Sequence, residues 1–151
     1  MVIIKIKNYS ILVKMVTKTI KVRDIMTRGI IKIKRDALVI DAMKTMLDRR
    51  VTSLIVEPEN GSDWGIITRK DIVNKVVAYR SDPKKIKVKD IMSTPLLTVH
   101  PDMTVDNVAR LMAKTNIRRF PVSDGKDIIG VVSNSDIFKA VTLELLEEGQ
   151  R

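Results

Sequence analysis

Gly65-Ile66-Ile67-Thr68-Arg69-Lys70-Asp71 recurs later in the chain as Gly130-Val131-Val132-Ser133-Asn134-Ser135-Asp136. The two stretches lie near the ends of a longer repeat, in which residues 22 to 77 recur as residues 88 to 142. A duplication of this kind usually means that two copies of one supersecondary unit stack and share a core. The repeat therefore predicts two similar folds in one chain.

The two copies keep a constant register over most of their length. The offset between matching residues is 66 up to Val56 and Val122, and 65 from Gly65 and Gly130 onward. One extra residue in the stretch 57 to 64 explains this change, because that stretch is rich in turn-forming residues and tolerates insertion. The copies are therefore homologous folds.

The composition limits the kind of protein. The chain has 151 residues, of which 44% are apolar, so it suffices for one domain or two small halves that share a core. It has no cysteine, which excludes disulfides, thiolate metal sites and cysteine nucleophiles and suits a reducing, cytoplasmic location. No apolar run approaches the ~20 residues that span a bilayer, so we expect no membrane segment.

The net charge of +10 is concentrated near the start of the chain. Residues 1 to 35 hold ten Lys and Arg against the single acidic Asp24. Such a basic segment either contacts a polyanion such as nucleic acid or is simply a solvated surface. The charge pattern alone leaves both interpretations open.

Each copy shows the same order of patterns: a short strand, an amphipathic helix, two strands and a closing helix. The first helix of each copy is predicted from apolar residues at positions i, i+3, i+4, i+7 and i+8. These residues are Val39, Ala42, Met43, Met46 and Leu47 in the first copy, and Val105, Val108, Ala109, Met112 and Ala113 in the second. The expected strands are 30 to 33, 53 to 56 and 65 to 68, matched by 96 to 99, 120 to 122 and 128 to 133.

These elements predict an α/β (α+β) fold class, with two β-α-β-β-α repeats packed as a pseudo-twofold pair around a cleft. Neither copy is expected to be stable alone, because fewer than ~60 residues bury too little surface. The predicted boundaries are a basic N-terminal extension at 1–19, a first repeat at 20–80, a linker at 81–87, a second repeat at 88–143 and a C-terminal helix end or tail at 144–151.

Three local signals bear on where helices begin and end. Thr104 is a good N-cap for the second copy's first helix, whereas its counterpart Leu38 has no capping side chain. The first copy's helix should therefore rely on Asp36 or fray. Pro83, in the linker, should end the helix that precedes it.

The first twenty residues lie outside the repeat. Residues 2 to 6 and 11 to 16 are apolar enough to form extra strands. Alternatively, Met15 is the native first residue and residues 1 to 14 are a leading extension. The intact mass of the natively expressed protein would separate these interpretations.

The repeated stretch from glycine to aspartate carries the strongest functional signal. Its glycine allows a ligand or a neighbouring backbone to approach closely. The pairs Thr68 with Asp71 and Ser133 with Asp136 also fit a capping box, which only satisfies the first backbone N–H groups of a helix. The two roles can coexist, because the hydroxyl can cap the helix while the carboxylate accepts hydrogen bonds from a ligand.

With these motifs in view, the chain resembles a tandem pair of cystathionine-beta-synthase (CBS) domains, also called a Bateman module. The resemblance covers residues 20 to 142. It is carried by Asp24-Ile25-Met26 and Asp90-Ile91-Met92, the two helical stripes, Arg118-Arg119-Phe120-Pro121-Val122 and both glycine-to-aspartate stretches. Each motif alone is weak, but their order and duplication are specific.

The resemblance implies a regulatory sensor that binds adenine nucleotides (AMP, ADP or ATP) or S-adenosylmethionine in clefts between the repeats. It requires no cofactor. In the family the motif aspartate holds the ribose hydroxyls, which implies this role for Asp71 and Asp136. The nearby hydroxyl contacts ribose or phosphate, which implies that role for Thr68 and Ser133.

The resemblance also implies where the adenine and the phosphates lie. The apolar residues expected to sandwich adenine are Ile31, Val51 and Val131 in one cleft and Leu97, Ile117 and Ile66 in the other. Arg118 and Arg119 take the positions that often meet phosphates, whereas their counterparts Thr52 and Ser53 are uncharged. The cleft with Asp136, Ser133 and the arginine pair should therefore prefer phosphorylated ligands, although Arg118 could point into the other cleft. Lys70 could supply compensating charge near Asp71.

The sequence argues against an enzyme. His100 is the only histidine, and no carboxylate cluster or phosphate-cradling glycine loop accompanies it. The expected partners are an adenosyl small molecule, a second copy of the chain in a homodimer, and a regulated protein. The alternative function is a basic scaffold that contacts nucleic acid through its N-terminal segment, with ligand clefts that are vestigial.

Overall fold

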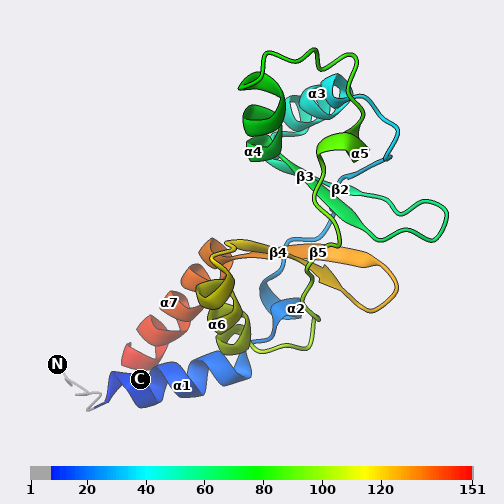
Figure 1. Cartoon of the computed structure of the whole chain (residues 1–151). Coiled ribbons are helices and arrows are strands. Elements are labelled where there is room, and N and C mark those ends of the chain that lie inside the picture. The colour runs from blue at the N-terminus through cyan, green and yellow to red at the C-terminus, as the bar shows by residue number, and fades with distance from the viewer. Residues whose placement is uncertain (1–7, 151) are drawn as a thin grey trace. The chain divides into compact units, whose positions relative to one another are not determined.

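The computed structural model describes residues 8 to 150, which form two compact units (Figure 1). The central unit is one continuous segment, Ile30–Leu96. The terminal unit joins the described residues up to Gly29 with those from Leu97 onward. The chain thus enters the terminal unit, builds the central unit and returns.

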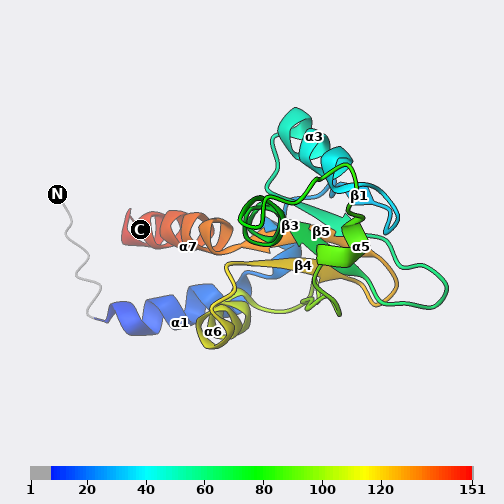
Figure 2. The ribbon, with the colours of Figure 1, turned by 45° about the horizontal axis from the view of Figure 1, so that its top comes forward.

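The central unit is a small sheet covered by helices. Its three strands are ordered β1-β2-β3, with β1 parallel to β2 and β2 antiparallel to β3. The elements are β1 Lys32–Ile33, α3 Val39–Arg49, β2 Ser53–Val56, β3 Gly65–Thr68, α4 Arg69–Ile72, a π-helical turn η1 Val73–Val77 and α5 Val88–Ile91. Helix α3, which Figure 2 shows on one side of these strands, packs against β2. Its residues Val39, Ala42 and Met46 are buried in the core of the unit.

The terminal unit repeats this plan and adds a helix at its start. Strands β4 and β5 are antiparallel, and Val99 pairs with Val122 in the parallel position that β1 takes in the other unit. The elements are α1 Tyr9–Thr19, α2 Val22–Ile25, α6 Val105–Thr115, β4 Arg119–Ser123, β5 Ile128–Ser133 and α7 Asn134–Gln150. Helix α1 packs against α7 and α6 (Figure 1).

The compact units do not coincide with the two sequence copies, because each copy gives its first short helix to the other copy's unit. Helix α2 precedes the first copy's strands, yet Val22 is fully buried in the core of the terminal unit. Helix α5 precedes the second copy's strands, yet Val88 and Ile91 are buried in the core of the central unit. The Asp-Ile-Met triplets therefore join the two copies.

The aspartate of each triplet stabilises the start of its short helix. Asp24 Oδ2 accepts a hydrogen bond from Lys21 N at 2.9 Å, and Asp90 Oδ2 accepts one from Lys87 N at 3.0 Å. These four-residue helices were not among the elements expected from the sequence. Their signal is the aspartate three residues after the N-cap position.

Each exchanged helix is also held by an ion pair with the loop that precedes the long helix of the same unit, α3 in the central unit and α6 in the terminal unit. Lys89 Nζ lies 2.9 Å from Asp36 Oδ1 in the central unit, and Arg23 pairs with Asp102 in the terminal unit. The bond from Lys89 lowers the pKa of Asp36 below its usual 3.8, and Asp36 raises the pKa of Lys89 above its usual 10.5. Arg23 likewise lowers the pKa of Asp102.

Asp36→Asn should therefore flatten the pH dependence of stability at both ends. A lowered carboxyl pKa contributes stability that is present above pH 3.8 and lost as pH falls below it, and a raised lysine pKa contributes stability that is lost as pH rises above 10.5. Urea unfolding across pH should show both losses in the wild type and smaller ones in the variant. Because both groups are exposed, the difference should fade in 1 M salt.

Asp48→Asn is the matched control, since Asp48 is exposed on α3 and makes no ion pair with any residue between 8 and 150. It should leave the pH profile unchanged. Equal profiles for the wild type and Asp36→Asn would contradict the role given to this ion pair.

Several expected elements are confirmed and others are wrong. Strands 53 to 56, 65 to 68 and 128 to 133 form as expected, and α3 and α6 begin where the stripes begin. The first strand of each copy is shorter than expected: β1 covers Lys32–Ile33, and within 96 to 99 only Val99 is bridged to a strand. Pro83 does not end a helix, because η1 already stops at Val77.

The largest correction is at the N-terminal end. Residues 11 to 16, for which an extra strand was one of the two interpretations, lie within helix α1, while residues 2 to 6 lie outside the described part of the chain. The Asn8 side chain caps this helix by accepting from Ser10 N at 3.1 Å. Val16 is then buried where α1 meets the rest of the terminal unit.

Thr104 has the N-cap position of α6 but does not cap it through its side chain. Its hydroxyl donates instead to Asp106, and this bond lowers the pKa of the Asp106 carboxyl. Leu38, as expected, provides no cap for α3, and Asp36 is engaged with Lys89 rather than with the helix.

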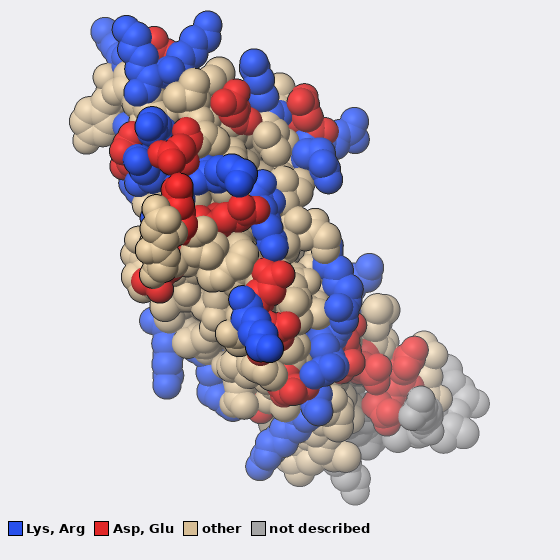
Figure 3. Space-filling model, turned by 90° about the vertical axis from the view of Figure 1, so that its right-hand side faces the viewer, with Lys and Arg blue, Asp and Glu red and all other residues tan. Residues whose placement is uncertain are grey.

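The basic leading segment is divided between the units. Lys14 and Lys18 belong to α1, whereas Lys32, Lys34 and Arg35 belong to the central unit. On the face shown in Figure 3, Lys and Arg are interleaved with Asp and Glu. The charge excess therefore does not belong to one structural element. Among the residues described, no helix is long and apolar enough to cross a membrane.

Candidate functional site

The first glycine-to-aspartate stretch forms β3 and the start of α4. The Thr68 backbone N–H and its hydroxyl both donate to Asp71 Oδ2, each at 2.9 Å. Asp71 N donates back to Thr68 Oγ1 at 3.1 Å. The capping box that the spacing suggested is therefore present.

The second stretch has the same geometry at the junction of β5 and α7. Ser133 N and Ser133 Oγ donate to Asp136 Oδ2 at 2.8 and 2.9 Å, and Asp136 N donates to Ser133 Oγ at 3.2 Å. In both units the cap fixes the aspartate side chain by one oxygen. The other oxygen, Oδ1, is left to make further interactions.

The two aspartates differ in what their Oδ1 meets. Asp71 Oδ1 lies 3.1 Å from Lys75 Nζ, one helical turn further on. Asp136 Oδ1 has no hydrogen-bond or ion-pair partner within residues 8 to 150. The two copies therefore have the same cap. They differ at the second carboxylate oxygen, Oδ1, which among the residues described is paired with a lysine in Asp71 and not in Asp136.

The two glycines serve the backbone. A Cβ atom on Gly130 would lie 2.7 Å from Thr27 O, and one on Gly65 would lie 3.1 Å from Ser93 O. These carbonyls belong to segments that pair with the strands: Thr27 with Val131, and Ser93 with Ile66. At each glycine the structure therefore shows the close approach of a neighbouring backbone segment.

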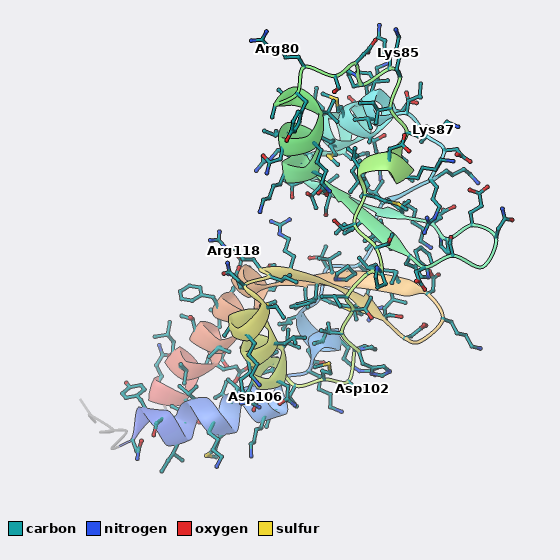
Figure 4. The ribbon with its side chains drawn as sticks, in the orientation of Figure 1. Arg80, Lys85, Lys87, Asp102, Asp106 and Arg118 are labelled. Carbon is teal, nitrogen blue, oxygen red and sulfur yellow. The ribbon has the colours of Figure 1, made fainter. Side chains whose placement is uncertain are left out.

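The residues at the start of the middle strands, β2 and β4, lie beside the caps. Ser53 pairs with Thr68, and Arg119 pairs with Ser133 in the same register. Arg69 N donates to Thr52 O, and Asn134 N donates to Arg118 O, both at 2.9 Å. Figure 4 shows Arg118 next to the start of α7. In the terminal unit, Arg118 and Arg119 therefore lie beside Ser133. In the central unit, Thr52 and Ser53 lie beside Thr68.

The six apolar residues expected around adenine fall into three environments. Ile31 and Val51 pack against the core of the central unit, and Ile117 packs against the core of the terminal unit. Ile66 and Val131 lie in strands whose neighbouring residues point into the core, so each shares the outer face with the cap hydroxyl, Thr68 or Ser133. Leu97 is exposed. The crosswise grouping of these residues stays a prediction.

Two other polar residues singled out in the sequence, His100 and Lys70, take no part in the caps. His100 Nδ1 accepts from Asp102 N at 3.1 Å in an exposed loop. Lys70 makes no ion pair in the described part of the chain, and the lysine that reaches Asp71 is Lys75. Sequence reasoning missed Lys75, although an aspartate and a lysine four residues apart on a helix are a recognised pairing signal.

A comparison with known families now identifies the fold. The CBS domain family matches residues 22–78 and again residues 88–143. The chain belongs to this family, as a pair of CBS domains. The expected α+β class and the two-repeat organisation are confirmed.

Known proteins of this family resemble the chain over most of its length. The mitochondrial CBS domain-containing protein CBSX3 of Arabidopsis thaliana is 39% identical over 120 residues, which are 77% of this chain but only 58% of that protein. The hexameric CBS-CP12 protein from bloom-forming cyanobacteria is 42% identical with a TM-score of 0.75, and the match covers 83% of this chain and 74% of that one.

One similar structure contains ligands. The CBS domain pair of protein MJ0100, solved in complex with 5′-methylthioadenosine and S-adenosyl-L-methionine, is 30% identical with a TM-score of 0.67. The match covers 87% of this chain and 98% of that one.

Proposed function

We propose that the chain is a regulatory CBS pair that binds an adenosyl ligand through its ribose hydroxyls. The observation that carries the proposal is the carboxylate of Asp136, which Ser133 fixes by one oxygen while Oδ1 has no partner among the residues described. A fixed carboxylate oxygen is a strong acceptor for the hydroxyls of a vicinal diol. The adenosyl ligands of the MJ0100 pair support this choice of ligand.

The arginine pair gives the site a second chemical property. Arg118 lies just before β4 and Arg119 is its first residue, beside Ser133, whereas Thr52 and Ser53 take the equivalent positions beside Thr68. Guanidinium groups bind phosphate through paired hydrogen bonds. We therefore expect the Asp136 site to favour phosphorylated ligands such as AMP or ATP more than the Asp71 site does.

The signal should leave through protein contacts, to a regulated partner or to a second copy of the chain. Helices α1 and α7 expose large apolar side chains, among them Tyr9, Met15, Phe138 and Leu146. Exposed apolar groups on packed helices favour association. Binding of nucleic acid is the weaker alternative, because the described basic residues of segment 1 to 35 are divided between the two units. The face shown in Figure 3 also carries Lys and Arg interleaved with Asp and Glu.

Asp136→Asn tests the ligand role without removing the cap. The amide oxygen can accept the bonds from Ser133, while the amide NH2 replaces the Oδ1 acceptor with a donor. Calorimetric titration with AMP, ATP and S-adenosylmethionine should show binding to the wild type. Affinity for the variant should be about tenfold to a hundredfold lower, because a hydrogen bond to a charged group contributes about 1.5 to 3 kcal/mol.

Two controls make this result specific. Glu147→Gln changes the same charge on an exposed position of α7 and should leave affinity unchanged. The 2′,3′-dideoxy form of adenosine should bind far more weakly than adenosine. Absence of binding of every adenosyl ligand to the wild type would refute the proposed function, and equal affinity for the dideoxy form would refute the role of the ribose.

A further inference from the structure

Asp71 and Asp136 occupy the same position in the two copies, but only Asp71 has a lysine on the next helical turn. Lys75 Nζ lies 3.1 Å from Asp71 Oδ1 and donates to Ile91 O at 2.8 Å. The residue that corresponds to Lys75 in the second copy is Ala140. The terminal unit therefore has no ammonium group at this position.

Both oxygens of Asp71 are consequently engaged. Oδ2 accepts from the backbone and hydroxyl of Thr68, and Oδ1 is paired with Lys75. The Asp71 side chain is only 14% exposed, so solvent screens this pair less than it screens a pair on the open surface. A ribose diol that approached Asp71 would have to compete with the ammonium for Oδ1.

The second acceptor makes Lys75 a persistent competitor. Ile91 O is the last carbonyl of α5, the short helix that the second copy contributes to the central unit. An ammonium group held by two acceptors at once has less freedom to swing away than one held by a single carboxylate. Lys75 also lies in the π-helical turn η1, and such turns are frequent at functional sites.

We propose that Lys75 is a built-in competitor of the ligand at Asp71, so that the Asp136 site fills first and the Asp71 site binds the same ligand more weakly. This inference rests on the proposed function, because it concerns the two aspartates assigned there to ribose. It adds a cause of inequality that is separate from the arginine pair. The arginine pair discriminates between ligands by phosphate, whereas Lys75 acts on any ligand that offers a ribose diol.

The test isolates each aspartate in turn and uses 5′-methylthioadenosine as the probe. This probe has the ribose diol but no phosphate, so the removal of a lysine cannot act through attraction to a ligand charge. In an Asp136→Asn background, which leaves the Asp71 site, Lys75→Met should increase affinity about fivefold, the factor that about 1 kcal/mol of ion pairing represents. Methionine keeps an unbranched apolar side chain and removes only the ammonium group.

The reverse change tests the same idea in the other copy. In an Asp71→Asn background, which leaves the Asp136 site, Ala140→Lys places a lysine four residues after Asp136. Affinity should fall about fivefold. Lys85→Ala is the control for net charge, because Lys85 lies on the exposed loop before α5 (Figure 4) and forms no ion pair with any described residue.

The outcomes separate this inference from the proposed function. If Lys75→Met binds the probe no more tightly than its Asp136→Asn parent, while that parent still binds, the inference is wrong and the proposed function stands. Weaker binding by Lys75→Met would also overturn it, because Lys75 would then assist the ligand. If neither the wild type nor any variant binds the probe or another adenosyl ligand, both fail. Thermal unfolding of each variant confirms that it is folded.

Discussion

Phe120→Ala should lower the free energy of unfolding of the terminal unit by about 3 to 5 kcal/mol. Phe120 is 1% exposed and is the largest fully buried side chain among the residues described. It packs in a core with Val99, Val108 and Val132, drawn from three separate parts of the unit. Alanine would leave a cavity that these neighbours cannot close, because they are small and branched at Cβ. Urea unfolding followed by far-ultraviolet circular dichroism measures the loss.

Phe120→Leu is the matched control, because the first copy has Leu54 at the corresponding position of its own core. A leucine fills most of the space and should destabilise by less than about 1.5 kcal/mol. If alanine and leucine destabilise equally, Phe120 is not the centre of this core. A loss below about 1 kcal/mol for alanine would have the same meaning.

The strands and long helices of each repeat were predictable because their apolar patterns are periodic. The stripe that begins at Val39 and the one that begins at Val105 fall on single helix faces, and both are buried. The region of α1 was misread because its residues are apolar on several sides, so that no period stands out. A helix forms there because Asn8 caps it and Val16 is buried in the terminal unit.

The exchange of the short helices could not be deduced from the repeat. The two copies have similar sequences, so Val22 and Val88 suit either core equally well in a pattern of hydrophobicity. Backbone pairing between distant segments decides which core each short helix joins. The segment after α2 bridges to β5 at Val131, and the segment after α5 bridges to β3 at Ile66. Backbone hydrogen bonds of this kind leave no trace in side-chain periodicity.

At the candidate site, too, local spacing was predictable from the sequence and contacts between distant segments were not. The capping boxes follow from a hydroxyl residue and an aspartate three residues apart, and both form as this spacing indicates. The inequality of the two sites was inferred from Arg118 and Arg119, whereas the contact of Lys75 with Asp71 adds a difference that was not anticipated. Its second contact, with Ile91 O, depends on the exchange of α5 and so appears only in the folded chain.

Gly130→Ala should destabilise the terminal unit by about 1 to 3 kcal/mol, the usual result of overpacking. A Cβ atom at this position would lie 2.7 Å from Thr27 O, which real Cβ atoms essentially never approach so closely. Thr27 O accepts from Val131 N, and Thr27 N donates to Val131 O, both at 2.9 Å. The added methyl group must push this segment away, and the two hydrogen bonds lengthen with it. Urea unfolding measures the change in stability.

The equivalent substitution in the other copy provides the control. At Gly65 the nearest atoms to an added Cβ are Thr94 Cγ2 at 3.0 Å and Met92 Sδ and Ser93 O at 3.1 Å, so two of the three neighbours are side-chain atoms that can rotate. Gly65→Ala should therefore be the milder change. In Gly130→Ala, hydrogen exchange at the amides of Thr27 and Val131 should accelerate, because the segment that they pair is displaced. If Gly65→Ala proves equally destabilising, or if exchange at those two amides is unchanged, the close approach of Thr27 to β5 is not what requires glycine at position 130.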